Sequence, residues 1–214
     1  MESVNAVRKT MKRAALSQQQ IVDMALILAS EDSVHNVSFR KLADRLSVTP
    51  MAIYRYFDDK EALQAAMLDQ FIINARVLPD SLLNWEQWLL HTSDKMYAAL
   101  CSEPGWITLF GQIQLKPGAL AVMDECLMTL EKAGFSIETA IESFFILFQN
   151  LLGAVCLNTA FNNSNGQGIV IEMESIQPYT LVKDNLIRLN KVDHQETLRS
   201  SITLLVESLK KKSH

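Results

Sequence analysis

Up to Phe71 the apolar residues recur at offsets of three and four, which is the period of an α-helix that buries one face. A first helix is predicted after Ser17, because Ser17 and Gln20 form a capping box of the Ser-x-x-Gln type. A second helix is predicted after Ser38, whose side chain can cap it. The apolar face of this second helix consists of Phe39, Leu42, Ala43 and Leu46.

A very short helix is predicted after a tight turn at Ser47 and Val48. Thr49 is expected to cap it through its hydroxyl, and Pro50 suits the first helical position because the N–H that proline lacks would have no partner there. A helix of roughly two turns is marginal in water, so its neighbours must hold it in place. The side chains available for its buried side are Ala52, Ile53, Tyr56 and Phe57.

Two short helices joined by a tight turn are typical of a helix-turn-helix, which places the first turns of its second helix in the major groove of DNA. The side chains expected to project from that helix are Thr49, Met51, Tyr54 and Arg55. The alternative is a small three-helix core whose basic face is only solvated. Spacing alone leaves both open, because a lone helix-turn-helix pattern has many false positives.

Asp58 to Glu61 repeats the capping-box pattern and predicts a further helix that continues through Phe71. Lys60 lies in its first turn, where a cation is unfavourable to the helix dipole, so another use is expected for it. Beside the N–H groups of a helix N-terminus, an ammonium group can clamp a phosphate. The alternative is a solvated lysine paired with Asp58 or Asp59.

These segments, in this order, resemble the tetracycline-repressor-like (TetR/AcrR) family of bacterial transcriptional regulators from about Ser17 to Phe71. Two departures concern Ser47 and Ser33, since the family usually has a glycine at the turn and another near the end of the first helix. The segments that carry the resemblance are Ile-Val-Asp-Met-Ala-Leu (21–26), Ser-Phe-Arg-Lys-Leu-Ala (38–43), Ala-Ile-Tyr-Arg-Tyr-Phe (52–57) and Lys-Glu-Ala-Leu (60–63).

The resemblance implies an all-α protein with an N-terminal helix-turn-helix DNA-binding domain of three helices over 1–60. A larger C-terminal helical domain over 61–214 would sense a ligand and dimerise. Arg40 would reach a base or the backbone near the groove edge, and Lys60 would close on the backbone. Tyr54 and Tyr56 would contact phosphates. The full set of expected DNA-binding residues is Ser38, Arg40, Lys41, Thr49, Pro50, Met51, Tyr54, Arg55, Tyr56 and Lys60.

Charge is distributed unevenly along the chain. The first 60 residues hold nine basic and seven acidic side chains, for a net +2, and the rest hold eleven and seventeen, for −6, so the overall −4 hides a basic N-terminal part. Residues 1–16 form a basic arm, which can add phosphate or minor-groove contacts. A disordered tail that only aids solubility is the alternative. The basic residues of the arm are Arg8, Lys9, Lys12 and Arg13.

The pattern after Phe71 predicts further helices and one polar loop. Asn84 opens a capping box, Gly134 is expected to end a helix, and Ser136 begins a long apolar helix of around 22 residues, or about 33 Å. A polar loop is expected over 158–177. The helices are expected at 84–101, 106–114, 117–133, 136–157, 178–189 and from 193 to the C-terminus.

Two of these late helices carry surplus apolar surface. The helix after Ser136 is apolar on more than one face, and the last helix has a heptad-like seam. This predicts a homodimer, which would span two half-sites of a near-palindromic operator. The family pairs such helices into a four-helix bundle; the alternative is that they form the monomer's own core. The expected interface residues are Phe144, Phe148, Leu152, Leu198, Ile202, Leu205 and Leu209.

The family resemblance also implies an effector pocket among the middle helices of the second domain. Its Met-rich, aromatic character suits a small hydrophobic effector with His91 and Gln149 as polar anchors, although each residue can instead be core. Trp85 and Trp88 are expected to be partly exposed rather than to line a cavity. The expected lining residues are Met67, Phe71, His91, Met96, Trp106, Phe110, Met123, Leu127, Phe145 and Gln149.

The function predicted from these patterns is a repressor that a small hydrophobic effector releases from its double-stranded DNA operator. The alternative is a DNA-bound adaptor of the same fold that acts through a protein partner and has no effector. A filled second domain would favour the adaptor, and a closed cavity would favour the sensor. An enzyme is not expected, because the chain lacks a nucleophile elbow, a phosphate-binding glycine loop and an HExxH pattern.

No cofactor and no metal are expected, because the four histidines are scattered. The chain is similar to the tetracycline-binding branch of the family over 85–153. That branch has a histidine that helps to hold magnesium, and Thr108, Leu109 and Phe110 occupy this stretch here, so tetracycline is not the expected effector.

The expected location is the cytoplasm, at the nucleoid, and no membrane partner is expected. No uninterrupted apolar run reaches the roughly 18 residues of a membrane-spanning helix, and the N-terminus lacks the apolar stretch of a signal peptide. Three cysteines far apart in the sequence are interpreted as buried thiols, with a redox sensor as the alternative.

Overall fold

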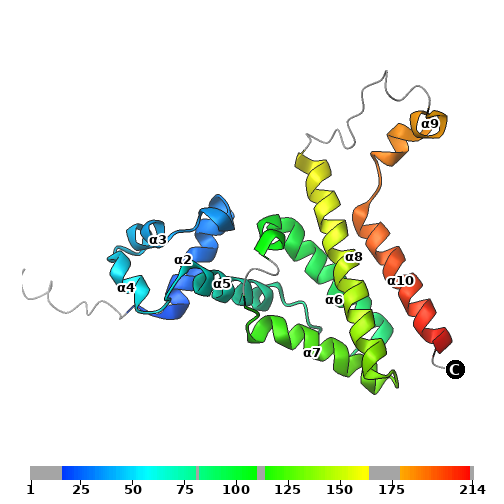
Figure 1. Ribbon diagram of the computed structural model, residues 1–214, viewed down its shortest axis with the longest axis horizontal. Helices are drawn as coiled ribbons and strands as arrows, with labels where there is room; N and C mark the ends of the chain where they lie inside the picture. Colours follow the sequence, from blue (N-terminus) through cyan, green and yellow to red (C-terminus); the bar gives the residue numbers. More distant parts are fainter. Residues whose placement is uncertain (1–15, 81, 110–113, 164–178, 213–214) are drawn as a thin grey trace, which may run out of the picture. The chain divides into compact units, whose positions relative to one another are not determined.

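The computed structural model describes residues 16–80, 82–109, 114–163 and 179–212, which fold into α-helices and short 3-10 helices without a strand (Figure 1). The all-α architecture predicted from the sequence is therefore confirmed for this part of the chain. The chain divides into two compact units, Met1–Met67 and Leu68–His214. The division falls inside one helix, whereas the sequence pattern placed the domain boundary after residue 60.

The N-terminal unit is built from helices that begin at polar caps. The Ser17 hydroxyl accepts from the Gln20 N–H while the Gln20 side chain accepts from the Ser17 N–H, so the predicted capping box is confirmed. The Ser38 hydroxyl accepts from the Lys41 N–H, as expected. The elements are α2 (Gln18–Glu31), η1 (Val34–Asn36), α3 (Phe39–Leu46), α4 (Pro50–Tyr54) and α5 (Lys60–Ala75), which continues into the second unit.

The turn between α3 and α4 differs from expectation in one respect. Ser47 adopts the left-handed conformation with φ of 54°, which explains why related sequences favour glycine there. Pro50 occupies the start of α4 as predicted, but the Thr49 side chain makes no capping hydrogen bond, so that expectation is wrong. Tertiary packing holds α4 instead, because Ile53 is fully buried and Phe57 is nearly so.

The C-terminal unit surrounds its longest helix. The elements are α6 (Trp85–Ser102), η2 (Pro104–Leu109), α7 (Pro117–Lys132), α8 (Ile137–Asn163), α9 (Thr180–Leu189) and α10 (His194–Lys212). Helix α8 packs against α6, α7 and α10, and α10 also packs against α6 (Figure 1). The largest fully buried side chains of this core are Trp106, Leu89, Leu100, Leu130, Leu198 and Ile202. No residue of α9 is buried.

Three boundaries in this unit can be compared with the sequence pattern. Gly134, with φ of 93°, follows the end of α7 as predicted. The expected helix over 106–114 is a 3-10 helix that ends at Leu109. Helix α8 runs 27 residues to Asn163, so the loop does not begin at 158; the Asn158 amide donates to the Cys101 sulfur at 3.3 Å. The rest of that loop lies outside the described residues.

Helix α8 is apolar over most of its circumference. By length and composition alone, 137–162 could cross a membrane, with a mean hydropathy of 1.7, although one such helix is weak evidence because core helices of soluble proteins pass the same test. Only 22% of its most apolar stretch is buried in the protomer. Helix α8 therefore presents apolar surface that the described part of the chain leaves uncovered.

Candidate functional site

Helix α4 exposes the residues that the sequence pattern assigned to its outer face. Thr49, Pro50 and Arg55 are exposed, and the side chains of Met51 and Tyr54 are 69% and 50% exposed. The Tyr54 ring packs edge-on against Phe39 of α3, with the centroids 4.6 Å apart. The exposed side of α4 thus combines apolar, aromatic and cationic groups that can contact base edges and phosphates.

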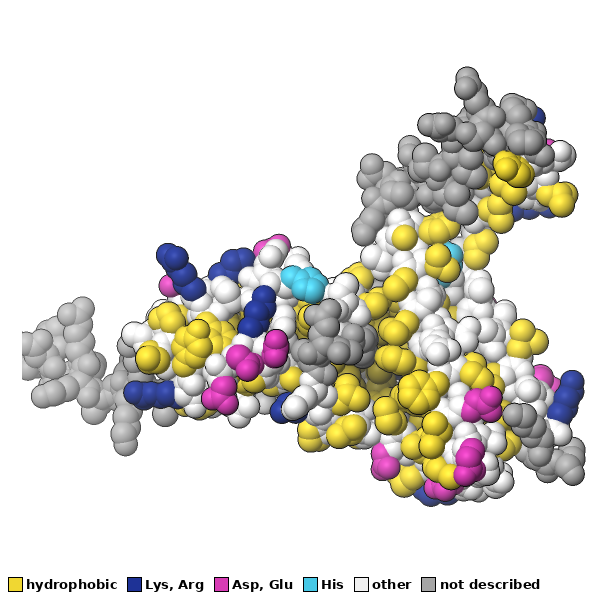
Figure 2. Space-filling model, in the orientation of Figure 1, with side chains coloured by type: hydrophobic (Ala, Val, Ile, Leu, Met, Phe, Trp, Pro, Cys, Tyr) yellow, Lys and Arg dark blue, Asp and Glu magenta, His cyan; other side chains and the backbone are white. Residues whose placement is uncertain are grey.

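The cations of α3 fall into two groups. The Lys41 ammonium pairs with Asp32 at 3.4 Å, and the Arg45 guanidinium makes two hydrogen bonds to the Glu31 carboxylate, which raise the pKa of Arg45. Arg40 is exposed and has no ion pair within the described residues, and the same holds for Arg55, which follows α4. In Figure 2, Lys and Arg side chains lie over this unit with acidic side chains between them.

Tyr56 and Lys60 are both hydrogen-bonded to backbone carbonyls of their own unit. The Tyr56 hydroxyl donates to the Leu16 carbonyl, and the Lys60 ammonium donates to the His35 carbonyl at 2.7 Å rather than pairing with Asp58 or Asp59. An ammonium has three donors, so Lys60 can keep this bond while it contacts a phosphate. The Tyr56 hydroxyl has one donor and must release Leu16 before it donates to a phosphate.

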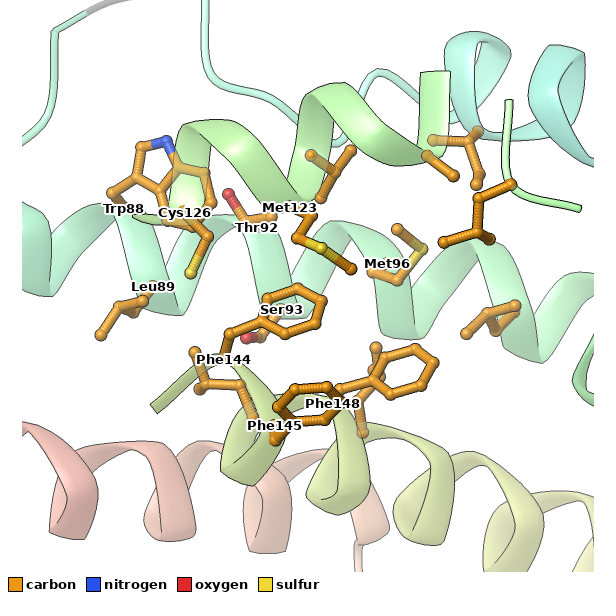
Figure 3. A pocket seen from close by; sticks show the side chains of 17 residues that line it. Trp88, Leu89, Thr92, Ser93, Met96, Met123, Cys126, Phe144, Phe145 and Phe148 are labelled. Carbon is orange, nitrogen blue, oxygen red and sulfur yellow. The ribbon is translucent and has the colours of Figure 1, made fainter. Parts of the chain in front are cut away.

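A cavity of about 400 Å³ lies between α6, α7 and α8 in the C-terminal unit, and Ile72 of α5 also lines it (Figure 3). Its walls are mainly aliphatic, aromatic and methionine side chains, which suits an apolar ligand. The lining residues of the three helices are Trp88, Leu89, Thr92, Ser93, Met96 and Leu100 from α6; Ala119, Val122, Met123 and Cys126 from α7; and Phe144, Phe145, Leu147, Phe148 and Leu151 from α8.

Only some of the predicted lining residues line the cavity. Met96, Met123 and Phe145 line the cavity. Phe71 and Trp106 are core residues whose rings stack 5.2 Å apart. The others do not line the cavity: Met67 is buried in the N-terminal unit, Leu127 and His91 are half-buried elsewhere, Gln149 lies in a groove on the other side of α8, and Phe110 lies outside the described residues.

Among the lining residues that the sequence pattern did not assign to the pocket, Trp88 and Thr92 carry buried polar atoms. Trp88, which was expected to be partly exposed, is 5% exposed and lines the cavity, so that expectation is wrong. Thr92 lies one helical turn further along α6 and is 7% exposed. The Trp88 Nε1 and Thr92 Oγ1 atoms are buried without a hydrogen-bond partner in the described structure. An i, i+4 pair on one α6 face was the available sequence signal.

Helices α8 and α10 form a second, shallower groove of about 340 Å³. The exposed residues Gln149, Gly153 and Leu157 line it from α8, and Thr197 lines it from α10. His194 also lines it, and its buried Nε2 has no hydrogen-bond partner among the residues described. This groove therefore joins apolar surface to a buried polar atom that lacks a partner.

Most residues predicted for the dimer interface lie instead in the protomer's core or on the cavity wall. Leu198, Ile202 and Leu209 are at most 2% exposed, so they lie in the protomer's own core, the alternative given above. Phe144 and Phe148 line the cavity. Leu152 and Leu205 are half-buried. A second copy would therefore contact other residues of α8 and α10.

Helix α7 is fixed to α5 by a close backbone contact. The Gly118 N–H, at the start of α7, donates to Asp69 Oδ1 of α5 at 2.5 Å. A Cβ atom at Gly118 would lie 2.8 Å from that oxygen and 3.1 Å from the Asp69 carbonyl oxygen, so a larger residue would require Asp69 to shift. Since α7 and Ile72 of α5 both line the cavity, this contact connects two of its walls.

The described residues contain no group of three or more His, Cys, Asp or Glu side chains that could hold a metal ion. Two of the three cysteines are also less buried than predicted, since Cys126 is buried but Cys101 is half-buried and Cys156 is exposed. Burial raises the pKa of the Cys126 thiol to about 12. Every ionisable group that lines the cavity is therefore neutral near pH 7.

Comparison with known proteins identifies relatives of both units. Residues 21–67 match the family described as bacterial regulatory proteins, tetR family. The class A tetracycline repressor protein of transposon 1721 from Escherichia coli is 24% identical over 202 residues, covering 92% of each chain. The repressor Rv1353c of Mycobacterium tuberculosis is 24% identical over 176 residues, which cover 78% of this chain and 67% of that protein.

Solved structures share the fold over nearly the whole chain. A possible TetR family regulator from Streptomyces coelicolor has a TM-score of 0.76 at 20% identity, with 91% of this chain and 99% of that chain covered. The TetR family protein ActR of the same organism, solved in complex with actinorhodin, has a TM-score of 0.75 at 13% identity, with 93% and 99% covered. The two-domain helical architecture is thus that of known regulators.

Proposed function

Since this chain belongs to the tetR family of bacterial regulatory proteins, we propose that it is a repressor that a small apolar effector releases from operator DNA. Membership makes it a DNA-binding transcriptional regulator, and the relatives named above include repressors. The single observation that carries the effector part is the cavity of about 400 Å³ in the C-terminal unit. A regulator of this kind acts in the cytoplasm, at the nucleoid.

The exposed face of α4 is the proposed base-contacting surface. Met51 and Tyr54 of α4 and Arg55, which follows it, are exposed where a helix-turn-helix contacts base edges, while Arg40 of α3 is available to phosphates. Lys41 is paired with Asp32, just after α2, and Arg45 with Glu31 at its end, and both cations are assigned a supporting role.

Arg55→Ala tests this surface, with Lys132→Ala as the control, because Lys132 is an exposed cation at the end of α7. In electrophoretic mobility-shift titrations with the promoter DNA next to the protein's own gene, we expect Arg55→Ala to weaken binding by about tenfold or more. Lys132→Ala should bind like the parent. Equal affinity for the parent and for folded Arg55→Ala would remove α4 from the DNA interface.

A homodimer is proposed to form through the groove face of α8 and α10. The apolar surface that α8 leaves uncovered and the unpartnered Nε2 of His194 both lie where a second copy can cover them. Two copies would present two helix-turn-helix units to the half-sites of a near-palindromic operator. The residues proposed for the interface are Gln149, Gly153 and Leu157 of α8 and Thr197 and Ser201 of α10.

Leu157→Glu tests the dimer, and Leu120→Glu is its control because Leu120 is a similarly exposed leucine on α7. Sedimentation velocity should show a monomer for Leu157→Glu and a dimer for Leu120→Glu, since a carboxylate buried at an interface without a partner is costly. Leu157→Glu should also lose operator affinity. A dimeric Leu157→Glu variant would move the interface elsewhere.

The effector part is tested by filling the cavity. Ala119→Phe places a ring among the lining residues of α7, whereas Ala121→Phe adds the same ring on an exposed position of that helix. A thermal-shift screen of metabolites and antibiotics should find compounds that stabilise the parent and Ala121→Phe but not Ala119→Phe. Those compounds should release the promoter DNA. If the shifting compounds leave the DNA bound, the adaptor alternative, which needs no effector, replaces the sensor.

A further inference from the structure

The cavity between α6, α7 and α8 is free of charged groups. Among the residues that line it in the described structure, none is Asp, Glu, Lys, Arg or His. A charged ligand would therefore lose its hydration without gaining a counter-ion, and such transfer is strongly unfavourable.

Among the described residues of this cavity wall, two polar atoms of α6 are buried without a hydrogen-bond partner. Trp88 Nε1 and Thr92 Oγ1 are each in a side chain more than nine-tenths buried, and neither has a partner among the described residues. Trp88 and Thr92 are one helical turn apart, so both belong to one face of α6. Figure 3 shows the Thr92 hydroxyl beside Met123 and Cys126 of α7.

The chemistry of these two atoms defines what they can bind. An indole N–H only donates, whereas a threonine hydroxyl donates and accepts. A ligand oxygen can accept from Trp88, and a ligand hydroxyl can donate to Thr92 or accept from it. Phe144, Phe145 and Phe148 offer aromatic surface to the remainder of the ligand (Figure 3).

Resting on the proposed function, which makes this cavity the effector site, we propose that it takes an uncharged, ring-bearing hydrophobic molecule with one oxygen head. That head is held by Thr92, and Trp88 Nε1 is the second donor available to it. Charged compounds of the same size are excluded, because no lining side chain can pair with them.

The test compares three probes that share one ring system: 2-naphthol, naphthalene and 2-naphthoate. Each is titrated into the full chain by isothermal calorimetry near pH 7. We expect 2-naphthol to bind about three- to tenfold tighter than naphthalene, the range for one hydrogen bond. The anion 2-naphthoate should bind at least about a hundredfold more weakly than 2-naphthol.

Variants locate the head group. Thr92→Val removes the hydroxyl at nearly constant volume and should abolish the preference for 2-naphthol over naphthalene, while naphthalene affinity persists and reports an intact cavity. Thr92→Ser should restore the preference. Thr203→Val makes the same change at an exposed threonine of α10 outside the cavity and should behave like the parent.

Equal affinity for 2-naphthoate and 2-naphthol would overturn the proposal, and so would an unchanged preference in Thr92→Val or failure of all three probes to bind. The proposed function fails separately. If 2-naphthol binds more tightly than naphthalene and this preference depends on Thr92, the proposed ligand class is supported. If operator DNA nevertheless stays bound, release of DNA by this class of ligand is ruled out.

Discussion

The two units of the molecule differ in where their proposed binding groups lie: on the exposed surface in one unit and inside a cavity in the other. In the N-terminal unit, Arg40, Tyr54 and Arg55 are exposed. In the C-terminal unit, the polar atoms of Trp88 and Thr92 are enclosed by apolar side chains. The difference follows from the proposed partners, because a polyanion is bound by exposed cations whereas an apolar ligand is bound by removing it from water.

Only α5 belongs to both units. It begins at Lys60, whose ammonium is bound to the His35 carbonyl, and it continues to Ile72, which lines the cavity. The two proposed binding sites therefore share one continuous helix. An effector that favours one position of α5 and DNA that favours another would compete through a single equilibrium, as reciprocal coupling between sites requires.

The largest expected contrast between the units is their response to salt. Raising the salt from about 50 to 200 mM should weaken operator binding by about a thousandfold or more, because each neutralised phosphate releases counterions. Binding of 2-naphthol to the uncharged cavity should change less than about twofold over the same range, since no ion pair forms. Fluorescence anisotropy with labelled DNA measures operator binding, and calorimetry measures 2-naphthol binding. A flat salt response of DNA binding would argue against the whole DNA assignment.

The cysteines of the C-terminal unit give the next contrast, between enclosed and exposed surface. Burial raises the pKa of Cys126 from 9.0 to about 12, so near pH 8 its thiolate is about a thousandfold scarcer than that of an unperturbed thiol. Cys156 is exposed. Iodoacetamide should therefore label Cys156 quickly and Cys126 only after unfolding in urea, as mass spectrometry can follow. Similar labelling rates would show that the cavity opens readily to water.

The N-terminal unit was largely predictable because its signals are local. The capping groups of Ser17 and Ser38 act within three residues, and Pro50 marks a helix start by its own covalent structure. Thr49 has the residue type of a cap but makes no capping hydrogen bond, and buried Ile53 holds α4 through packing that a local signal does not reveal. The Lys60 bond to His35 was missed, since it joins residues 25 positions apart through a backbone carbonyl that no sequence pattern marks.

The C-terminal unit was predictable in its helices but not in its cavity. Helical period shows which side chains point inward, yet the same period serves a filled core and a hollow one. Phe71 and Met123 were assigned alike, but one stacks on Trp106 and the other lines the cavity. Whether Leu198 faces its own core or a second copy depends on how α10 packs on α6 and α8, which is a long-range property.

A pair of glycines separates tight from open packing within the C-terminal unit. Gly118→Ala should lower the free energy of unfolding by about 1–3 kcal/mol, because the added Cβ meets Asp69 at 2.8 Å. In Gly153→Ala, in α8, the added Cβ has nothing within 4 Å in the protomer. The higher helix propensity of alanine should therefore raise the free energy of unfolding by about 0.5–1 kcal/mol. Urea denaturation measures both. If Gly153→Ala destabilises the protein and weakens its dimer, the second copy packs directly on this position.

The smallest expected effect concerns two of the three described residues with positive φ, Ser47 and Gly134; the third is Arg76, with φ of 47°. Ser47 in the N-terminal unit has φ of 54°, whereas the C-terminal unit places Gly134 at φ of 93°. A left-handed residue with a side chain is strained by about 1–2 kcal/mol, and glycine relieves this but gains entropy in the unfolded chain. Ser47→Gly should therefore stabilise the protein by at most about 1 kcal/mol, while Gly134→Ala should destabilise it by about 1–2 kcal/mol.

Ser47→Ala is the matched control for that prediction, because it keeps a Cβ in the same left-handed position and should give no gain in the free energy of unfolding. Because Ser47 ends α3 and precedes the DNA-contacting helix, the substitution should also leave operator affinity unchanged if α4 keeps its orientation. A Ser47→Gly protein that is more stable but binds DNA more weakly would mean that the strained turn helps to orient α4. DNA binding by the N-terminal unit would then depend on backbone strain, whereas ligand binding by the C-terminal unit depends on an enclosed cavity.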